Sequence, residues 1–251
     1  MSAEGLVVSV DGVVARVRLS RPHKRNALDA ATIAGLHAFF ASPPAGVRVA
    51  VLTAEGDHFC AGLDLSEHVR RSPMEALESS RAWHRAFDAI ELGTIPVVAV
   101  LKGAVIGGGL ELAASCHVRL ADRTTFFALP EGQRGIFLGG SGSVRITRLI
   151  GMDRVREMML TGRRYGAEDG LRLGIVHELA EANEADARAQ ALAESVAKNS
   201  DASTFAMLQS LPRIAAMPPE HGLYAEALTT VFVQSDPAAE DRMSAFLEKR
   251  S

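Results

Sequence analysis

The chain has 251 residues, which is enough for one large domain or for one domain with an appendage. Hydrophobic residues make up 47% of the chain and charged residues 23%, as in an ordinary soluble globular protein. The formal net charge of -3 argues against binding to nucleic acid or to a membrane surface through charge, and no apolar run approaches the length of a membrane span.

Cysteine usage and the first residues of the chain bear on its compartment. The two cysteines, Cys60 and Cys116, are far apart in the sequence and fit neither a disulfide framework nor a zinc site. Residues 1–4 lack the basic and apolar regions of a signal peptide. We therefore expect a cytoplasmic protein that holds no metal.

Hydrophobic periodicity predicts strands and helices that alternate along most of the chain. Asp11-Gly12 is a hairpin signal between the first two strands, and Gly174 is placed to close a helix. The expected strands cover residues 6–10, 13–19, 47–53, 97–106, 118–121 and 175–176. The expected helices cover residues 28–40, 74–92, 109–116, 143–150, 153–160 and 167–173.

Beyond Glu184 the pattern becomes helical throughout and is interrupted only by prolines. Strands that alternate with helices, followed by helices alone, indicate an α/β core with a helical tail. We place the core at residues 1–190 and a C-terminal helical region at residues 191–251.

Three consecutive glycines, Gly107 to Gly109, end an apolar run and begin a helix that carries Glu111 in its first turn. Glycines let the backbone turn sharply and let a ligand approach main-chain N–H groups. A helix start leaves N–H groups unpaired and carries partial positive charge, so it favours a developing anion. A carboxylate beside such a turn is suited to moving protons next to a carbonyl group.

Two further glycine-rich loops, residues 57–65 and residues 129–143, follow predicted strands, and the second contains another acid, Glu131. Together with the triple glycine, these loops resemble those of the crotonase superfamily, also called the enoyl-CoA hydratase/isomerase family. The resemblance runs nearly end to end, through segments at residues 19–22, 26–28, 161–162, 167–168, 174–176 and 245–250. It implies a crotonase-like spiral of repeated ββα units with a C-terminal helical region.

The resemblance also implies a catalytic site. The backbone N–H groups of Leu63 and Gly108 correspond to the two halves of the family's oxyanion hole, which stabilises an enolate formed from a thioester. Glu111 and Glu131 correspond to the two glutamates that hydratases of the family use as general acid and base. The sequence therefore favours hydration of a 2-enoyl-CoA to a 3-hydroxyacyl-CoA, or the reverse, and leaves open which glutamate is the acid.

Coenzyme A is then expected as part of the substrate, with no permanently bound cofactor. Ser66 stands where the family often has a lysine for a CoA phosphate, so Lys24 or Arg25 is expected to take that role. The residues expected to bind substrate or CoA are Lys24, Arg25, Ala27, Ala61, Asp64 and Leu65. The helical tail is expected to form a homo-trimer or a dimer of trimers.

The loop after Glu131 departs from the family pattern, with Gly132-Gln133-Arg134 in place of apolar residues and Leu138 in place of a common proline. These changes leave the acyl chain undetermined. They also leave double-bond isomerisation, or hydration with carbon–carbon cleavage of an aryl-propenoyl-CoA, as alternatives within the family.

Other protein classes fit the sequence less well. Paired carboxylates also occur in glycosidases, but aromatic content of 5% offers few platforms for stacking sugars. Some relatives bind RNA, but the acidic balance of this chain opposes that. A non-catalytic scaffold is a further alternative, but the presence of both glutamates argues against it.

Several residues near these motifs have structural interpretations. Glu111 could be an ordinary first-turn acid, and Glu131 could be solvated or paired with Arg134. Cys60 lacks the partners of a nucleophile and is expected to be a small buried residue. The residues expected to pack or to lie on the surface are His58, His68, Arg70, Arg71, Trp83 and Phe87.

Overall fold

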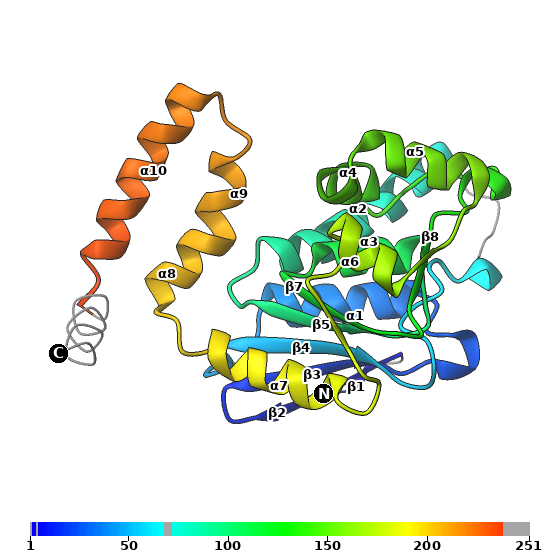
Figure 1. The fold of residues 1–251 in the computed structure, drawn as a ribbon, viewed down its shortest axis with the longest axis horizontal. Coiled ribbons are helices and arrows are strands. Elements are labelled where there is room, and N and C mark those ends of the chain that lie inside the picture. The colour runs from blue at the N-terminus through cyan, green and yellow to red at the C-terminus, as the bar shows by residue number, and fades with distance from the viewer. Residues whose placement is uncertain (1, 4, 68–71, 238–251) are drawn as a thin grey trace.

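The computed structural model describes residues 2–3, 5–67 and 72–237. Figure 1 shows a body in which helices cover a sheet, and a helical hairpin near the C-terminus that projects from this body. His68, Arg70, Arg71 and the segment 245–250 lie outside the described residues, so the expectations for them stay predictions.

A seven-stranded sheet forms the centre of the body, in the order β1-β2-β3-β4-β5-β7-β10. β1, β2 and β3 pair antiparallel, and β3 and the strands after it pair parallel. The strands are β1 (Ser2–Ala3), β2 (Leu6–Asp11), β3 (Val14–Leu19), β4 (Val49–Ala54), β5 (Val97–Leu101), β7 (Val118–Asp122) and β10 (Glu178–Ala180).

A smaller sheet of three strands stands at the end of the parallel strands, with the order β6-β8-β9. β6 pairs parallel with β8, and β8 pairs antiparallel with β9. The strands are β6 (Ala104–Ile106), β8 (Phe126–Ala128) and β9 (Tyr165–Gly166).

Ten α-helices occur in the part of the chain that the structure describes, with single turns of other helix types between them. The first seven are α1 (Ala30–Ala41), α2 (Pro73–Glu91), α3 (Gly108–Ser115), α4 (Gly142–Ile150), α5 (Met152–Thr161), α6 (Ala167–Leu173) and α7 (Ala185–Val196). The last three are α8 (Asp201–Phe205), α9 (Leu211–Ile214) and α10 (Pro219–Gln234), with a π-helical turn (Ala206–Ser210) between α8 and α9.

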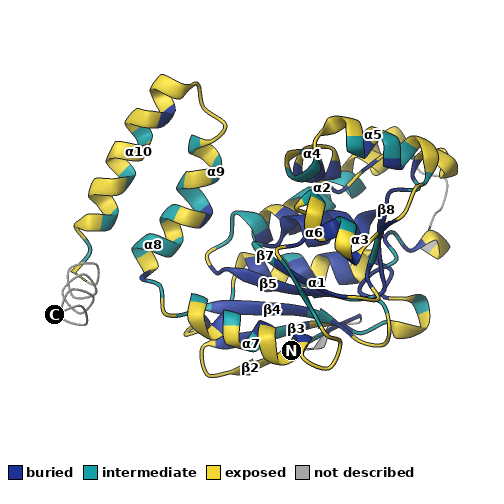
Figure 2. Cartoon of the chain, in the orientation of Figure 1, coloured by how far each residue is buried: buried dark blue, intermediate teal, exposed yellow. Residues whose placement is uncertain are grey.

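The central strands are buried on both faces, as parallel sheets generally are. In β4, Ala50 and Leu52 join the main core, whereas Val49 and Val51 point to the opposite face. That face is covered by α7, through small buried residues such as Ala189. Figure 2 shows this burial as dark strands between layers of partly exposed helices.

The predicted strand at residues 97–106 is two strands in two different sheets. The chain turns at Gly103, whose φ of +50° suits glycine. A Cβ there would lie 2.3 Å from the carbonyl oxygen of Asp57, so the two segments approach backbone to backbone. This turn carries β6 out of the central sheet and directs it towards α3.

Two further sequence expectations were wrong in detail. The expected strand at Ile175 and Val176 does not form, because both N–H groups donate to the carbonyl oxygen of Gly170 and end α6. The expected helix at residues 28–40 begins at Ala30, where Asp29 caps it by accepting a 2.8 Å hydrogen bond from the N–H of Thr32. Leu28 is thereby free to pair with Leu63.

The C-terminal helices have a different environment from the core. The expected boundary after residue 190 falls inside α7, whose Ala193 is buried against the sheet. From Asp201 onward the helices pack mainly on one another, with α10 against α8, the π-helical turn and α9. None of the described helices is both long and apolar enough to cross a membrane.

Candidate active site

The loop that ends at Asp64 is fixed by main-chain hydrogen bonds to β6, the strand that leads into α3. The N–H of Cys60 donates to the carbonyl oxygen of Ala104 at 2.9 Å, and the N–H of Ile106 donates to that of Cys60 at 3.0 Å. On the other side, Leu28 donates to the carbonyl oxygen of Gly62 at 2.7 Å and accepts from Asp64 at 2.9 Å. Residues 60–64 are therefore clamped between β6 and the segment before α1.

The clamp brings the N–H of Leu63 beside Gly108. A Cβ built on Gly108 would lie 3.5 Å from the Leu63 nitrogen. Among the described residues none accepts a hydrogen bond from the N–H of Leu63. Gly108 is the first residue of α3, where helices leave N–H groups without internal partners. Two unpaired donors thus lie next to each other at the start of a helix, as an oxyanion hole requires.

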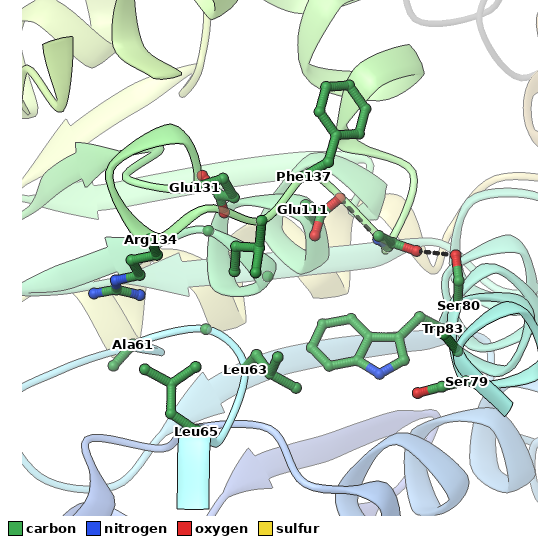
Figure 3. Close-up of a pocket in the computed structure, with 17 residues that line it drawn as sticks. Ala61, Leu63, Leu65, Ser79, Ser80, Trp83, Glu111, Glu131, Arg134 and Phe137 are labelled. Atoms are coloured by element: carbon green, nitrogen blue, oxygen red, sulfur yellow. Dashed lines mark hydrogen bonds between the residues drawn. The ribbon is translucent and has the colours of Figure 1, made fainter. Parts of the chain in front are cut away.

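A cavity of about 500 Å³ opens at these two donors. Its walls are the 61–65 loop, the first residues of α3, one face of α2 and the 131–140 loop. Figure 3 shows the indole of Trp83 reaching from α2 across the cavity below Glu111. The same indole explains the glycine at position 108, because a Cβ there would lie 2.5 Å from its ring.

Glu111 is buried in the cavity wall and is 3% exposed. Its Oε1 accepts hydrogen bonds from the N–H groups of Gly140 at 2.9 Å and Gly142 at 2.6 Å. Burial raises the pKa of Glu111 to about 7, against the effect of these hydrogen bonds and of the Arg145 charge. The negative charge of Glu131 raises it further. Glu111 can therefore gain or lose a proton near neutral pH.

Glu131 enters the same cavity from the opposite loop and is 6% exposed. Burial raises its pKa, and the nearby positive charge of Arg134 opposes this shift. Within the described chain no group donates a hydrogen bond to its Oε2, although that atom is buried. A buried carboxylate oxygen without a protein partner is available to a substrate or to water.

Six of the predicted site residues line the cavity: Ala61, Leu63, Leu65, Gly108, Glu111 and Glu131. The other four, Lys24, Arg25, Ala27 and Asp64, do not line it. Lys24, Arg25 and Ala27 belong to the segment behind the 61–65 loop, where the carbonyl oxygen of Arg25 accepts from Ala61. Asp64 belongs to the loop itself and is ion-paired with Arg21 and Lys24 of that segment.

Asp64 organises this outer layer. Its side chain is buried and accepts from Ser66, from Arg21 at 2.8 Å and from Lys24 at 3.3 Å. The Ser66 hydroxyl group, together with these cations, lowers the pKa of Asp64 well below its ordinary value. Lys24 also donates to the Ser66 hydroxyl at 2.6 Å, so its ammonium group lies at the position where the family often has a lysine.

The sequence did not identify Trp83 as a cavity residue, because its helical spacing with Phe87 is that of a core stripe. Phe87 is indeed fully buried, whereas Trp83 is only partly buried and faces the cavity. The sequence also gave no role to the N–H groups of Gly140 and Gly142. Hydrogen bonds from main-chain groups leave no signal in side-chain identity.

Two residues near the site have structural roles, as expected. His58 accepts a 3.1 Å hydrogen bond from the N–H of Ala104 through Nδ1. Cys60 is fully buried, and burial raises its pKa to about 12, so its thiol stays protonated at neutral pH. Among the described residues no three His, Cys, Asp or Glu side chains are grouped so that they could hold a metal ion.

Known proteins resemble this chain over most of its length. The model of the enoyl-CoA hydratase/isomerase family matches residues 10–251. The chain is 29% identical over its whole length to the short-chain-enoyl-CoA hydratase of Clostridium acetobutylicum, 97% of which is covered. It is 33% identical over 77% of its length to the mevalonyl-coenzyme A hydratase of Aspergillus fumigatus, of which 72% is covered.

The structure superimposes on a crystal structure from Rhodopseudomonas palustris CGA009, of a protein provisionally named enoyl-CoA hydratase. The TM-score is 0.95 at 47% identity, with 98% of this chain and 96% of that chain covered. The chain therefore belongs to the enoyl-CoA hydratase/isomerase family, and the predicted crotonase-like fold is confirmed.

From the raised pKa of Glu111 we predict how the free energy of unfolding depends on pH. The pKa is about 7 in the folded protein against an ordinary 4.5, so the folded state binds the proton more tightly. The contribution of Glu111 to the free energy of unfolding therefore falls as pH rises from about 4.5 to about 7, because the carboxylate must be charged while it is buried. Glu111→Gln removes this loss and should be more stable than the wild type by roughly 3 kcal/mol at pH 8.

Urea unfolding at pH 4 and at pH 8 measures this difference, which should nearly vanish at pH 4. Glu226→Gln, at an exposed position on α10, is the matched control for loss of a carboxylate. An equal stability difference for Glu111→Gln at the two pH values would contradict the buried, raised-pKa carboxyl group.

Proposed function

We propose that this protein catalyses the addition of water to a 2-enoyl-CoA thioester, giving a 3-hydroxyacyl-CoA, and the reverse dehydration. The observation that carries the proposal is the pair of buried carboxyl groups, Glu111 and Glu131, in one cavity with two unpaired N–H donors. Two carboxyl groups suit hydration, because one proton leaves the water and another is delivered to carbon.

In the proposed reaction the thioester oxygen accepts hydrogen bonds from the N–H groups of Leu63 and Gly108. These donors act most strongly as negative charge builds on that oxygen in the enolate. One glutamate takes a proton from water while the water oxygen bonds to Cβ, and the other delivers a proton to Cα as the enolate collapses. The sum adds H and OH across the double bond and leaves the enzyme's proton count unchanged.

The phosphates of coenzyme A are proposed to lie outside the cavity, near Lys24. Its ammonium group is held by Asp64 and Ser66 on the far side of the 61–65 loop. Arg25 lies beside it, with an exposed side chain and a backbone that supports Ala61. A thioester held with its carbonyl group at Leu63 then extends past Leu65 towards these cations.

The acyl chain is proposed to run over Trp83 towards the small residues of α2, Ala76, Ser79 and Ser80. The length and branching of the acyl chain that fits would depend on these side chains and on Ile136 and Phe137, in the loop that differs from the family pattern. The names of two relatives point to different acyl groups, since one is named for short-chain substrates and the other for mevalonyl-CoA.

The helical extension formed by α8, the π-helical turn, α9 and α10 is proposed to join subunits into a homo-trimer or a dimer of trimers. Figure 2 shows it as largely exposed, and within the described residues its apolar side chains have little of the chain to cover them. Exposed apolar area of this kind marks protein interfaces. The large exposed side chains there are Phe205, Met207, Leu211, Met217, Leu223, Tyr224, Leu228, Val231 and Phe232.

The reaction is tested first with crotonyl-CoA, whose conjugated absorbance falls when water adds. Glu111→Gln and Glu131→Gln should each lower the hydration rate by about 10²–10⁴-fold, because each removes a general acid or base. Full activity in either variant would reject the two-glutamate mechanism. Wild-type protein that only moves the double bond, or that cleaves an aryl-propenoyl-CoA, would replace hydration by one of the family's alternatives.

The CoA site is tested with Lys24→Ala. Loss of a contact made equally in ground and transition states should raise KM for the CoA thioester by about tenfold and leave kcat nearly unchanged. The N-acetylcysteamine thioester of the same acid lacks the phosphates, so its KM should not change. Lys198→Ala, at an exposed position just after α7 that does not line the cavity, is the control. An unchanged KM in Lys24→Ala would remove Lys24 from the site.

The assembly is tested by sedimentation. The wild type should sediment as a trimer or hexamer, and the double variant with Leu228→Glu and Val231→Glu should shift towards monomer, because it places charge on the apolar face of α10. Val10→Glu, at an exposed apolar residue of β2, is the control. A wild-type monomer at working concentration would contradict the proposal.

A further inference from the structure

Beside the catalytic cavity, α2 and α4 are joined by an ion-pair cluster to which the mechanism above assigns no role. Arg145 of α4 is buried, with its side chain 5% exposed. Its Nη2 lies 2.6 Å from Oδ1 of Asp88, and its Nε lies 2.5 Å from Oε2 of Glu91. Both carboxylates belong to α2, so this one guanidinium group fixes the start of α4 against the last turns of α2.

The same guanidinium group also holds the turn that precedes α4. Its Nη1 donates to the hydroxyl oxygen of Ser141, and the Ser141 hydroxyl donates to the carbonyl oxygen of Gly140. Ser141 has a φ of +92°, in the left-handed region that residues with a Cβ rarely adopt. A backbone conformation of this kind persists only where its surroundings hold it. Arg145 bonds the Ser141 side chain itself, while Ser80 of α2 donates a 2.7 Å hydrogen bond to the carbonyl oxygen of Gly139 at the start of the turn.

The conformation of this turn matters because it points two main-chain donors at one carboxylate. The N–H groups on either side of Ser141, those of Gly140 and Gly142, are the two that donate to Oε1 of Glu111. The turn also has little room to move. A Cβ on Gly140 would lie 2.9 Å from the rings of both Trp83 and Phe87, and one on Gly142 would lie 2.8 Å from Cγ of Glu111.

We propose that Arg145 is a positioning residue, which locks the turn at residues 139–142 onto α2 and so fixes the orientation of the Glu111 carboxyl group for proton transfer. Its action passes through Ser141 and the two glycine N–H groups, and Arg145 itself does not line the cavity. The proposal rests on the proposed hydratase function for the role of Glu111 in turnover, but the geometry of the lock does not depend on it.

Charge is a second way in which Arg145 can act on Glu111. The charged groups that act on Glu111 are Glu131 from the facing loop and Arg145 from α4. Arg145 lowers the pKa of Glu111, and the carboxylates of Asp88 and Glu91 lie beyond it on α2. Variants must therefore separate the loss of the positive charge from the loss of the lock.

Three substitutions make this separation. Arg145→Met removes both charge and lock. Arg145→Lys keeps the charge but lacks the planar fork that bonds Asp88, Glu91 and Ser141 at once. Ser141→Ala keeps Arg145 and its charge and breaks only the link to the turn. Arg119→Met is the control, because Arg119 is a buried arginine that bonds the carbonyl oxygens of Cys116 and Ile175, away from Glu111.

The first readout is titration of Glu111 by ¹³C NMR of labelled glutamate carboxyl groups, assigned with Glu111→Gln, and it needs no turnover. Arg145→Met should titrate above the wild-type value of about 7, since it loses both the charge and well-aimed N–H donors. Arg119→Met should leave the Glu111 titration unchanged even where it lowers stability.

The second readout is kcat for hydration. Arg145→Lys and Ser141→Ala should each lower kcat by about 10–100-fold with KM nearly constant, because the carboxyl group is misplaced while binding is intact. Wild-type kcat and wild-type Glu111 titration in folded Arg145→Met and Ser141→Ala would overturn the proposal. A wild type that hydrates no enoyl-CoA would reject the proposed function, and the NMR titration would still decide on Arg145.

Discussion

The site depends on the close backbone approach between the 60–64 loop and the start of α3. Gly109 lies so near this loop that a Cβ would be 2.4 Å from the carbonyl oxygen of Cys60, and a Cβ on Gly62 would be 2.7 Å from that of Ile106. Only glycine allows two main chains to pack at this distance. The approach places the N–H groups of Leu63 and Gly108 together, and the cavity and both glutamates are arranged around them.

Burial gives this arrangement its chemistry. A carboxyl group in water would be fully ionised at neutral pH, whereas Glu111 is enclosed by the core and by the turn before α4, so its proton is held more tightly. The N–H donors limit that shift and fix the carboxyl group in place. The enclosure costs folding stability, and this cost at a functional site is offset by the packed sheets and helices around it.

Much of the fold follows from the sequence alone. Alternating apolar residues predict β2 and β3, the triple glycine predicts the strand-to-helix junction at α3, and Gly174 marks the end of α6. The short strands β8, β9 and β10 were missed, because two or three residues carry too little periodicity to register. They form only because β6 and β7 are present as edges on which they can pair.

The sequence by itself determined the family, through motifs that resemble those of its members, and the triple-glycine turn. It also predicted the two glutamates, because both stand inside those motifs. Tertiary structure alone decided that Trp83 lines the cavity while it also packs against the core, that Lys24 lies behind the loop at Ser66, and that Arg145 bonds the turn aimed at Glu111. The physical reason is that each of these facts depends on which distant segments meet. Hydrogen bonds from main-chain N–H groups, in particular, are specified by backbone geometry and leave no trace in residue type.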